Sequence, residues 1–479
     1  MTMEKKLSNN CLHNDFKGKD NGYEWPQIFA IFISSLASLC CGLAFSWFSP
    51  SLPVIISDKE NYDITEDQAS YFTVLPPATM MLSVPLFSSL NDRIGRKKVI
   101  MIMGVIQIVA WSLVSVANNV YVFYLSRCVN GLGDGCLFTA LPMYIGEVSN
   151  PKVRGRWGNI LTFNIYFGQC LINIIGSNFS IVHTAYIVLV VPIVFLVIFY
   201  FFPESPYYLV MKGKEEEAKA ALKWLTRKDN IEEDFLQLKY DVARQMSETG
   251  TWCDLFKNIA YRKALYAGLF LRISQQLGGI SVFAIYTQFI FAKAGTNMSP
   301  SNASIIFTGL ICILNFIAGF TIDKFGRRPA YMVSSFFSGV VLFLLSCYFY
   351  IDDYQIEIDL SSFKWVPLAG MMVFVFTYSF GLGVVPTLML GELFSASIKS
   401  KGLCFLTIIF GVLVGSLTKL FHILESNYGL FCPFLLFSLS SLIGTILTVY
   451  FVPETKGKTL EEIQQALKGE KKEKKNEIL

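Results

Sequence analysis

The stretch Asp92-Arg93-Ile94-Gly95-Arg96-Lys97-Lys98 recurs 231 residues later (323 − 92) as Asp323-Lys324-Phe325-Gly326-Arg327-Arg328. Each copy of this short basic turn lies between two long apolar runs. The repetition of the turn in the same setting predicts that the chain consists of two related halves. Duplicated halves around a central cavity are common among membrane carriers.

The composition is that of a membrane protein. The chain has 479 residues, 53% of them hydrophobic and 16% charged, and a mean hydropathy of +0.48. Ordinary soluble domains are less apolar than this. The apolar stretches of roughly 20 residues match a hydrocarbon core of about 30 Å crossed as helix, and the sequence lacks the short alternating segments of a barrel. Because lipid offers the backbone no hydrogen-bond partners, we expect the spans to be helices.

The apolar stretches predict an all-α membrane protein with 12 transmembrane helices in two six-helix bundles. The predicted spans are roughly 27–50, 69–90, 99–117, 121–145, 158–177, 184–202, 264–291, 303–322, 330–350, 365–390, 403–422 and 431–452. The predicted units are an N-terminal tail (1–26), a first bundle (27–202), a linker with short amphipathic helices (203–263), a second bundle (264–452) and a C-terminal tail (453–479). We expect the linker to be a connector on the membrane face rather than a folded domain.

The short basic loops predict the orientation of the chain. The positive residues of segments 92–98, 152–156 and 327–328 all fall on one side of the predicted membrane, and such residues are retained in the cytoplasm. Both tails are therefore expected to be cytoplasmic, in a multi-pass protein of the plasma membrane. The three Asn-x-Ser sequons, at Asn178, Asn297 and Asn302, fall in or beside predicted external loops, where glycans can be attached.

Several function classes are excluded by the composition. The net charge of +4 carries no nucleic-acid signal, and the chain has only three His. Most of the 11 Cys lie inside apolar runs, where they are interpreted as small core residues. We find no nucleotide-binding loop, metal cluster or nucleophile–base set. The sequence therefore predicts neither an enzyme nor a cofactor.

The two halves also match beyond the basic turn. Glu147 precedes Arg154 by seven residues, and Glu392 precedes Lys399 by seven. Acids and bases at these helix ends predict one cluster in each half: Asp92, Arg93, Arg96, Glu147 and Arg154 in the first, and Asp323, Arg327, Arg328, Glu392 and Lys399 in the second. Partly exposed ion pairs contribute ~1 kcal/mol or less each, which suits a latch between two states of similar energy. The alternative is that these charges only set the topology.

Further motifs follow one another along the chain. They are Arg127-x-x-x-Gly131-x-Gly133, Pro142-x-Tyr144-x-x-Glu147, Pro203-Glu204-Ser205-Pro206, Gln275-Gln276-x-x-Gly279, Gly381-x-Gly383 with Pro386, and Pro453-Glu454-Thr455-Lys456-Gly457. Together with the two basic turns, they resemble the sugar porter family of the major facilitator superfamily, the relatives of glucose facilitators and facilitated trehalose transporters. The resemblance covers nearly the whole chain and implies alternating access by two six-helix bundles.

The resemblance also implies roles for individual residues. The basic turns, with Gly95 and Gly326, and the charge clusters would hold the cytoplasmic gate. The adjacent amides of Gln275 and Gln276 would hold sugar hydroxyls, and Tyr286 would belong to the outer gate. Buried amides need partners, so the alternative for the two glutamines is to join neighbouring helices.

The tenth predicted span contains Gly381, Gly383 and Pro386 in its middle. Glycine and proline weaken the backbone hydrogen-bond ladder of a helix and permit bending. We expect this helix to bend beside the cavity during gating. The alternative is that the glycines serve close helix packing.

Several ligand positions of the family are changed here. The substrate-binding candidates Thr162, Ser281 and Thr387 replace a glutamine, an asparagine and a tryptophan of the family pattern, and Asn315 lies about four residues from its expected position. These replacements remove hydrogen-bonding groups and one stacking platform, so they are expected to alter sugar recognition.

Three charged residues, Arg127, Asp134 and Arg272, lie within predicted spans. Charges at membrane depth usually face a cavity or a partner. Arg127 and Asp134 share a helix face but lie about 10 Å apart along the axis, too far to pair directly. For Asp134 we consider a salt bridge to Arg272, proton transfer or a place on a hydrated wall. For Arg272 the remaining alternative is that its aliphatic chain lies along the apolar helix surface and its guanidinium reaches the membrane surface.

These observations predict a facilitated-diffusion transporter for a small sugar, a hexose or a disaccharide such as trehalose. The predicted partners are the sugar and the lipid bilayer, without nucleic acid, and a monomer is expected. The predicted first span contains no Asp or Glu, which argues against proton-coupled symport. The alternatives are a transporter of a polyol or other non-sugar solute, a proton-coupled symporter, and a non-transporting sugar sensor.

Overall fold

The computed structural model describes residues 23–247, 250–354, 361–394, 396–454 and 456. Its regular elements in these ranges are all helices. The first half contains α2 (Trp25–Phe45), α3 (Phe48–Ser57), α4 (Glu66–Ile94), α5 (Arg96–Ser115), α6 (Val120–Val148), α7 (Pro151–Trp157), α8 (Ile160–Asn178) and α9 (Ile181–Phe199).

Four short helices connect the halves: α10 (Pro206–Met211), α11 (Glu215–Thr226), α12 (Glu232–Ser247) and α13 (Trp252–Lys257). The second half contains α14 (Ile259–Leu277), α15 (Ile280–Ile285), α16 (Thr287–Lys293), α17 (Pro300–Phe325), α18 (Arg327–Asp353), the 3₁₀ turn η1 (Ser361–Phe363), α19 (Val366–Ser379), α20 (Val385–Leu393), α21 (Ala396–Tyr428) and α22 (Phe431–Phe451).

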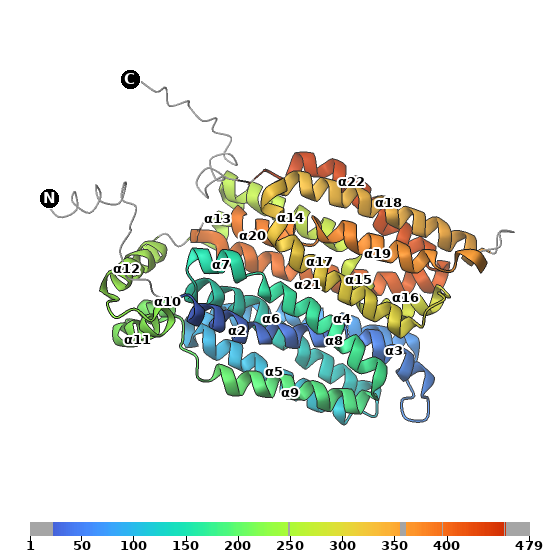
Figure 1. Ribbon diagram of the computed structural model, residues 1–479, viewed down its shortest axis with the longest axis horizontal. Coiled ribbons are helices and arrows are strands. Elements are labelled where there is room, and N and C mark those ends of the chain that lie inside the picture. Colours follow the sequence, from blue (N-terminus) through green and yellow to red (C-terminus); the bar gives the residue numbers. More distant parts are fainter. Residues whose placement is uncertain (1–22, 248–249, 355–360, 395, 455, 457–479) are drawn as a thin grey trace, which may run out of the picture.

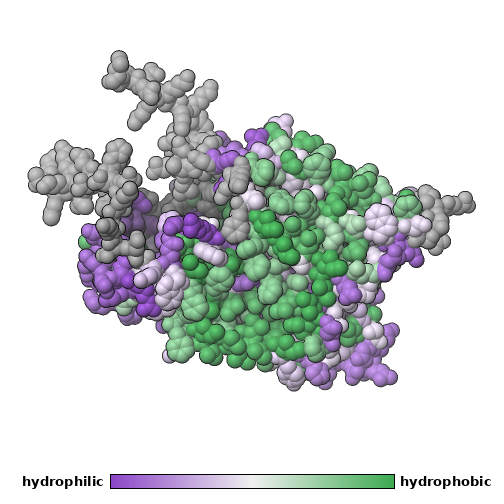
Figure 2. Space-filling view, viewed as in Figure 1, coloured by the Kyte–Doolittle hydropathy of each residue, from purple (hydrophilic) through white to green (hydrophobic). Residues whose placement is uncertain are grey.

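The two halves lie side by side, with α8 packed against α17 and α4 against α21. Figure 1 shows α10, α11 and α12 at one end of the bundles and α3 and α16 at the other. We call these the linker end and the distal end. Apolar side chains cover the middle of the surface, and hydrophilic side chains gather at both ends (Figure 2). This is the surface that a membrane-spanning bundle requires.

Nine segments within the described ranges are long and apolar enough to cross a membrane by length and composition. The other three predicted spans are the more polar or interrupted ones. Helix α6 carries three charged residues, Arg127, Asp134 and Glu147. The seventh span is divided into α14, α15 and α16, and the tenth into α19 and α20. The interruptions in the seventh and tenth spans therefore mark the spans that hold Gln275, Gln276, Ser281 and Thr387, four of the six predicted substrate-binding residues.

Each of the repeated basic turns has a glycine with a positive φ as its fourth residue. Gly95 has φ 105° between α4 and α5, and Gly326 has φ 88° between α17 and α18. A side chain is strained at such angles, so glycine is required for the tight reversal from one span to the next. The two halves thus share the same connection at equivalent places, as the sequence repeat indicates.

Candidate functional site

The charge cluster of the first half lies at the linker end around Arg96, whose side chain is only 2% exposed. Its Nε lies 3.1 Å from a carboxylate oxygen of Glu147, and its Nη2 lies 3.4 Å from Asp92 Oδ1. The structure therefore brings together three of the five predicted residues. Arg93 contributes its carbonyl oxygen, which accepts a hydrogen bond from a tyrosine hydroxyl. The exposed Arg154 donates to the Gly146 carbonyl (3.3 Å) and forms no ion pair with this cluster among the described residues.

A carboxylate that was not among the predicted gating residues completes this cluster. Glu204 Oε1 accepts hydrogen bonds from the backbone N–H groups of Lys97 (3.0 Å) and Ser205 (2.8 Å). The hydroxyl of Ser205 in turn donates to Glu147. A carboxylate at a helix N-terminus satisfies orphan donors and interacts favourably with the helix dipole. Glu204 therefore fixes the start of α5.

The second half repeats this arrangement 250 residues later (454 − 204). Glu454 accepts from the backbone N–H groups of Arg327 and Arg328, both at 3.1 Å, at the start of α18. Each acid follows a proline directly after the last span of its half, and this repeated Pro-Glu pair is the sequence signal from which its role could have been predicted. The side chains of Asp323 and Glu392 lie outside the described residues, whereas Arg327 and Lys399 both have partners.

The two predicted amides lie at the end of α14, where the seventh span is interrupted. Gln275 Nε2 donates to the Leu382 carbonyl (3.0 Å), and Gln275 Oε1 accepts from Arg272 Nη1 (3.0 Å). Gln276 Oε1 accepts from the Ser281 hydroxyl (2.6 Å). Gly279, with φ 84°, sets the break. Both amides thus have protein partners in this conformation, and those partners are polar groups that a ligand hydroxyl can replace.

The tenth span was expected to be one bent helix, and this expectation is wrong in detail. Helix α19 ends at Ser379 and α20 begins at Val385, with Pro386 in its first turn. A Cβ at Gly381 would lie 2.3 Å from the Ala330 carbonyl oxygen, and one at Gly383 would lie 2.6 Å from Asn315 Oδ1. The helix is interrupted at these glycines, and the same glycines allow close packing against neighbouring helices. The two interpretations of the glycines, a bend in the helix and close helix packing, therefore do not exclude each other.

Asn315 contacts this break from α17. Its Nδ2 donates to the Ile311 carbonyl (2.9 Å) and to the Ser379 hydroxyl (3.1 Å), and its oxygen has no hydrogen-bond partner among the described residues. Thr162 is half-buried on α8, and Thr387 is exposed on α20. Ser281 lies in the interrupted seventh span, and Asn315 bonds to the end of α19 in the interrupted tenth span. Neither Thr162 nor Thr387 forms a hydrogen bond with the two amides among the described residues.

The charges within the spans are separated. Arg127 donates to the carbonyls of Phe72 and Ala44, both at 3.0 Å, and lies over the Trp47 ring. The groups that act on Asp134 are Cys41 and Arg127. Asp134 therefore does not form the salt bridge to Arg272 that the sequence suggested as one alternative. Nor does Arg272 extend toward the membrane surface, because it bonds to Gln275.

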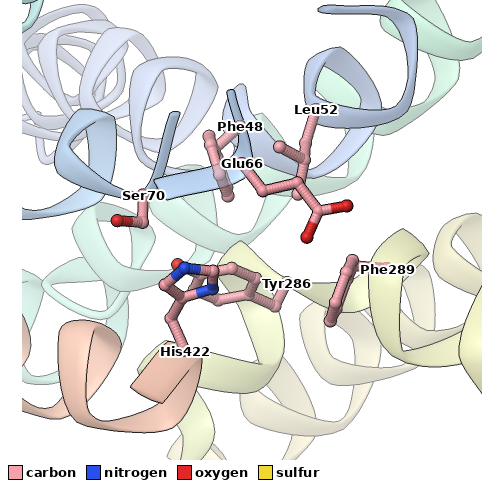
Figure 3. A pocket seen from close by; sticks show the side chains of 7 residues that line it. All are labelled: Phe48, Leu52, Glu66, Ser70, Tyr286, Phe289 and His422. Atoms are coloured by element: carbon pink, nitrogen blue, oxygen red, sulfur yellow. The ribbon is translucent and has the colours of Figure 1, made fainter. Parts of the chain in front are cut away.

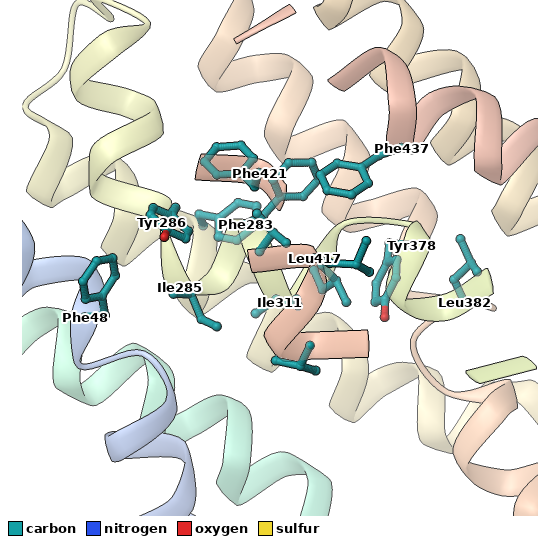
Figure 4. Close-up of a cluster of buried hydrophobic side chains, with 14 of the residues drawn as sticks. Phe48, Phe283, Ile285, Tyr286, Ile311, Tyr378, Leu382, Leu417, Phe421 and Phe437 are labelled. Carbon is teal, nitrogen blue, oxygen red and sulfur yellow. The ribbon is translucent and has the colours of Figure 1, made fainter. Parts of the chain in front are cut away.

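The distal end is closed by contacts between the halves. Tyr286 is buried with its ring centroid 5.2 Å from that of Phe48 on α3, and the two rings, which lie next to each other in Figure 4, meet edge to face. The Ser46 hydroxyl donates to the Ala284 carbonyl (2.9 Å). Gln288 Nε2 donates to the Ser177 hydroxyl (2.8 Å). Tyr286 thus lies where the family resemblance places an outer gate.

A small cavity lies in this distal contact. Its lining includes Phe48, Glu66, Tyr286 and His422, which surround it in Figure 3. Its volume is about 10 Å³, which is room for about one water molecule and not for a sugar. The path between the halves is therefore shut at the distal end. The three sequon residues, Asn178, Asn297 and Asn302, are exposed near this end of the molecule.

A family model described as "Sugar (and other) transporter" matches residues 56–467. The facilitated trehalose transporter Tret1 of Bombyx mori is 31% identical over 447 residues, covering 92% of this chain and 87% of that protein. Tret1 of Apis mellifera ligustica is 29% identical over 474 residues, covering 97% and 93%.

Solved structures of a bacterial sugar transporter share the fold. The proton:xylose symporter XylE bound to 6-bromo-6-deoxy-D-glucose has a TM-score of 0.73 at 21% identity, covering 93% of this chain and 100% of that chain. A partially occluded, inward-open conformation of XylE from E. coli has a TM-score of 0.74 at 20% identity, covering 90% and 99%. These structural matches confirm the predicted all-α fold of two six-helix bundles, and the family match confirms the prediction of a sugar transporter. The chain belongs to the Sugar (and other) transporter family of membrane proteins.

Proposed function

We propose that this protein carries a small sugar, a hexose or a disaccharide such as trehalose, across the plasma membrane by facilitated diffusion. The observation that carries the proposal is the family match over residues 56–467, which spans both halves without interruption. The similar insect proteins are facilitated trehalose transporters. Helix α2, which forms most of the first span, contains no Asp or Glu to carry a proton. These observations favour sugar uniport over polyol transport, proton symport or sensing.

The orientation is part of the proposal. The basic turns and the linker helices lie at the linker end, and positive residues are retained in the cytoplasm. The exposed sequon residues lie near the distal end, which is the extracellular end in this orientation. The conformation described here is then one whose extracellular entrance is closed.

The sugar site is proposed to lie where the interrupted spans meet. Gln276, Ser281 and Gln275 present amide and hydroxyl groups whose present partners are other polar groups. A sugar hydroxyl both donates and accepts, so it can replace these partners at little net cost in hydrogen bonds. The unpartnered, buried oxygen of Asn315 offers one more acceptor at the same break.

The alternation is proposed to occur by rocking of the halves about this site. Opening the distal end requires breaking the contacts of Tyr286, Ser46 and Gln288 with the other half. At the linker end, Arg96 and Glu147 bond within one half, whereas Arg154 is exposed. We expect the Arg154 guanidinium to pair with the second half when the linker end closes.

Purified full-length protein in liposomes tests the function. Uptake of radiolabelled trehalose, glucose and a polyol such as sorbitol is measured with and without a pH gradient. Saturable sugar uptake that is independent of the gradient is expected. Polyol uptake without sugar uptake would indicate a polyol transporter, and acceleration by an inward proton gradient would indicate a symporter. Sugar binding without flux would indicate a sensor, and each of these results would contradict the proposal.

Variants of the two amides test the site. Gln275→Ala and Gln276→Ala should each lower sugar uptake about tenfold or more, because each leaves polar groups of the site unpaired. Gln237→Ala is the matched control, because Gln237 lies on α12 in the linker and bonds there to Asp241. Uptake that is unchanged in both amide variants, at equal surface expression, would remove the binding-site claim.

A further inference from the structure

Arg272 is an arginine that the described fold leaves without an acidic partner. It lies on α14, three residues before Gln275, and its Nη1 donates to Gln275 Oε1 at 3.0 Å. Its Cζ lies 5.2 Å from the centroid of the Phe410 ring of α21. The enclosed Nε has no hydrogen-bond partner in the part of the chain that the structure describes. The guanidinium therefore retains unused donor capacity directly beside the proposed sugar site.

The surroundings of Arg272 come from both halves of the molecule. The titratable groups that act on its charge are the phenols of Tyr166, on α8 of the first half, and Tyr378, on α19 of the second half. Figure 4 shows Tyr378 near Leu382, whose carbonyl accepts from Gln275. The Phe410 ring also lies 6.1 Å from the ring of Phe138 on α6. Arg272 thus lies at the boundary between the halves, where a transported solute must pass.

The acids described within the spans are engaged elsewhere. Asp134 is influenced by Cys41 and Arg127 in the first half. Glu147 bonds to Arg96 at the linker end, and Glu425 bonds to Lys293 near the distal end. Among the described residues, no carboxylate forms an ion pair with Arg272. Its positive charge is compensated only by phenol, amide and aromatic groups.

A guanidinium at membrane depth is costly unless a negative charge compensates it. Arginine also matches carboxylate and phosphate oxygens in a two-point geometry that neutral groups do not offer. We infer that the solute carried by this protein is a sugar bearing an acidic group, a carboxylate or a phosphate, which binds Arg272 while the amides hold its hydroxyls. This inference rests on the proposed sugar transport and narrows its substrate class.

The inference agrees with the changed ligand positions. Ser281 and Thr162 offer shorter polar groups than the asparagine and glutamine of the family pattern. A site that loses hydroxyl-binding amides and holds an uncompensated guanidinium has exchanged neutral contacts for a charged one. Such an exchange changes which sugar is accepted, because a binding site rejects a ligand that leaves the buried polar groups of the site without hydrogen-bond partners.

Liposomes containing the full-length protein provide the test. Uptake of radiolabelled glucose is measured in competition with unlabelled glucose, glucuronate and glucose 6-phosphate, and direct uptake of the two acids is measured at a clamped membrane potential. At least one acid should compete about tenfold better than glucose, as expected for a hydrogen bond to a charged group. Its uptake should rise when the interior is made positive. The two acids distinguish a carboxylate from a phosphate as the preferred group.

Variants assign the effect to Arg272. Arg272→Gln should remove the preference for the acid, measured as the ratio of the inhibition constants of glucose and the acid in the same variant, and Arg272→Lys should retain part of it. Arg262→Gln, an exposed arginine of the same helix, is the matched control and should leave the preference unchanged. If Arg272→Gln does not fold, the competition series on the unaltered protein still decides the question.

The outcomes separate this inference from the proposed function. Glucose uptake without competition from either acid would overturn the inference and leave sugar transport standing. A preference for the acid that persists in Arg272→Gln would also overturn it. Absence of uptake for every sugar, neutral or acidic, would instead be the failure of the proposed function.

Discussion

Lys419 is the side chain whose loss should most directly open the distal end. It lies on α21 in the second half, and its contacts described here are with α4 of the first half. Its Nζ lies 2.7 Å from Asp67 Oδ1 and 2.8 Å from the Ser70 hydroxyl, and 4.1 Å from the centroid of the Tyr71 ring. These contacts join the two halves, so they exist only while the distal end is closed.

The expected effect of Lys419→Met follows from these contacts. Asp67 is 69% exposed, so its ion pair contributes only about 0.5 kcal/mol. The contact with the Tyr71 ring contributes about 0.5 kcal/mol, and the hydrogen bond to Ser70 about 1 kcal/mol. Together they favour the closed distal end by about 2 kcal/mol, so the variant should raise the ratio of open to closed molecules about 30-fold.

Thiol labelling measures this ratio. Ser281→Cys places a reporter beside Gln276, and a membrane-impermeant maleimide is applied from the distal side. The parent without the reporter accounts for the native cysteines. Lys419→Met should label the reporter up to about 30-fold faster, in proportion to the open fraction. Lys364→Met, an exposed lysine at the same end, is the control. A labelling rate equal to that of the parent, or an equal rise in the control, would refute the reasoning.

Three further predictions concern the stability of the scaffold, measured as the melting temperature in detergent. Glu204→Gln and Glu454→Gln should each lower stability by about 1–2 kcal/mol, because a charged acceptor at a helix start becomes neutral; equal melting temperatures would contradict the capping role. Thr65→Ala removes the capping box of α4 and should cost about 1 kcal/mol, whereas Thr65→Ser should not. Gly279→Ala puts a Cβ at φ 84° and 2.8 Å from two phenylalanine rings, so a loss of about 1–3 kcal/mol and of uptake is expected; a fully active variant would show that the break tolerates a side chain.

The fold was predictable because its signals are local and repeated. Span length is set by membrane thickness, so apolar runs alone mark most of the helices. The turns at Gly95 and Gly326 require a residue that tolerates a positive φ next to basic residues that stay on one side of the membrane. Because the same basic turn occurs in both halves, the sequence alone indicates the duplication, without any knowledge of tertiary contacts.

The details of the site were less predictable, because they depend on contacts that are distant in sequence. Gln275 is expected to bind a ligand, and in this conformation its amide nitrogen donates to the carbonyl of Leu382, 107 residues away, a partner that the sequence does not reveal. That carbonyl is available only because the tenth span is interrupted between Ser379 and Val385. Glycine and proline indicated weakness in this span, but the choice between a bend and a break is made by close packing against α18. The partners of Lys419 are likewise hidden from the sequence, because they lie about 350 residues earlier.

The positions of the interruptions indicate how the halves can move without unfolding. At the linker end, Glu204 and Glu454 bind backbone N–H groups of the turns, so each half is held rigidly within itself. At the distal end, Ser46 lies in the interruption between α2 and α3 and donates to the carbonyl of Ala284, in the six-residue α15. Part of the closure is therefore made by single hydrogen bonds to short, interrupted segments, each about 1 kcal/mol. Contacts of this strength can be broken and remade while charge-assisted contacts within each half persist, so the two bundles rock as units and their interrupted spans adjust.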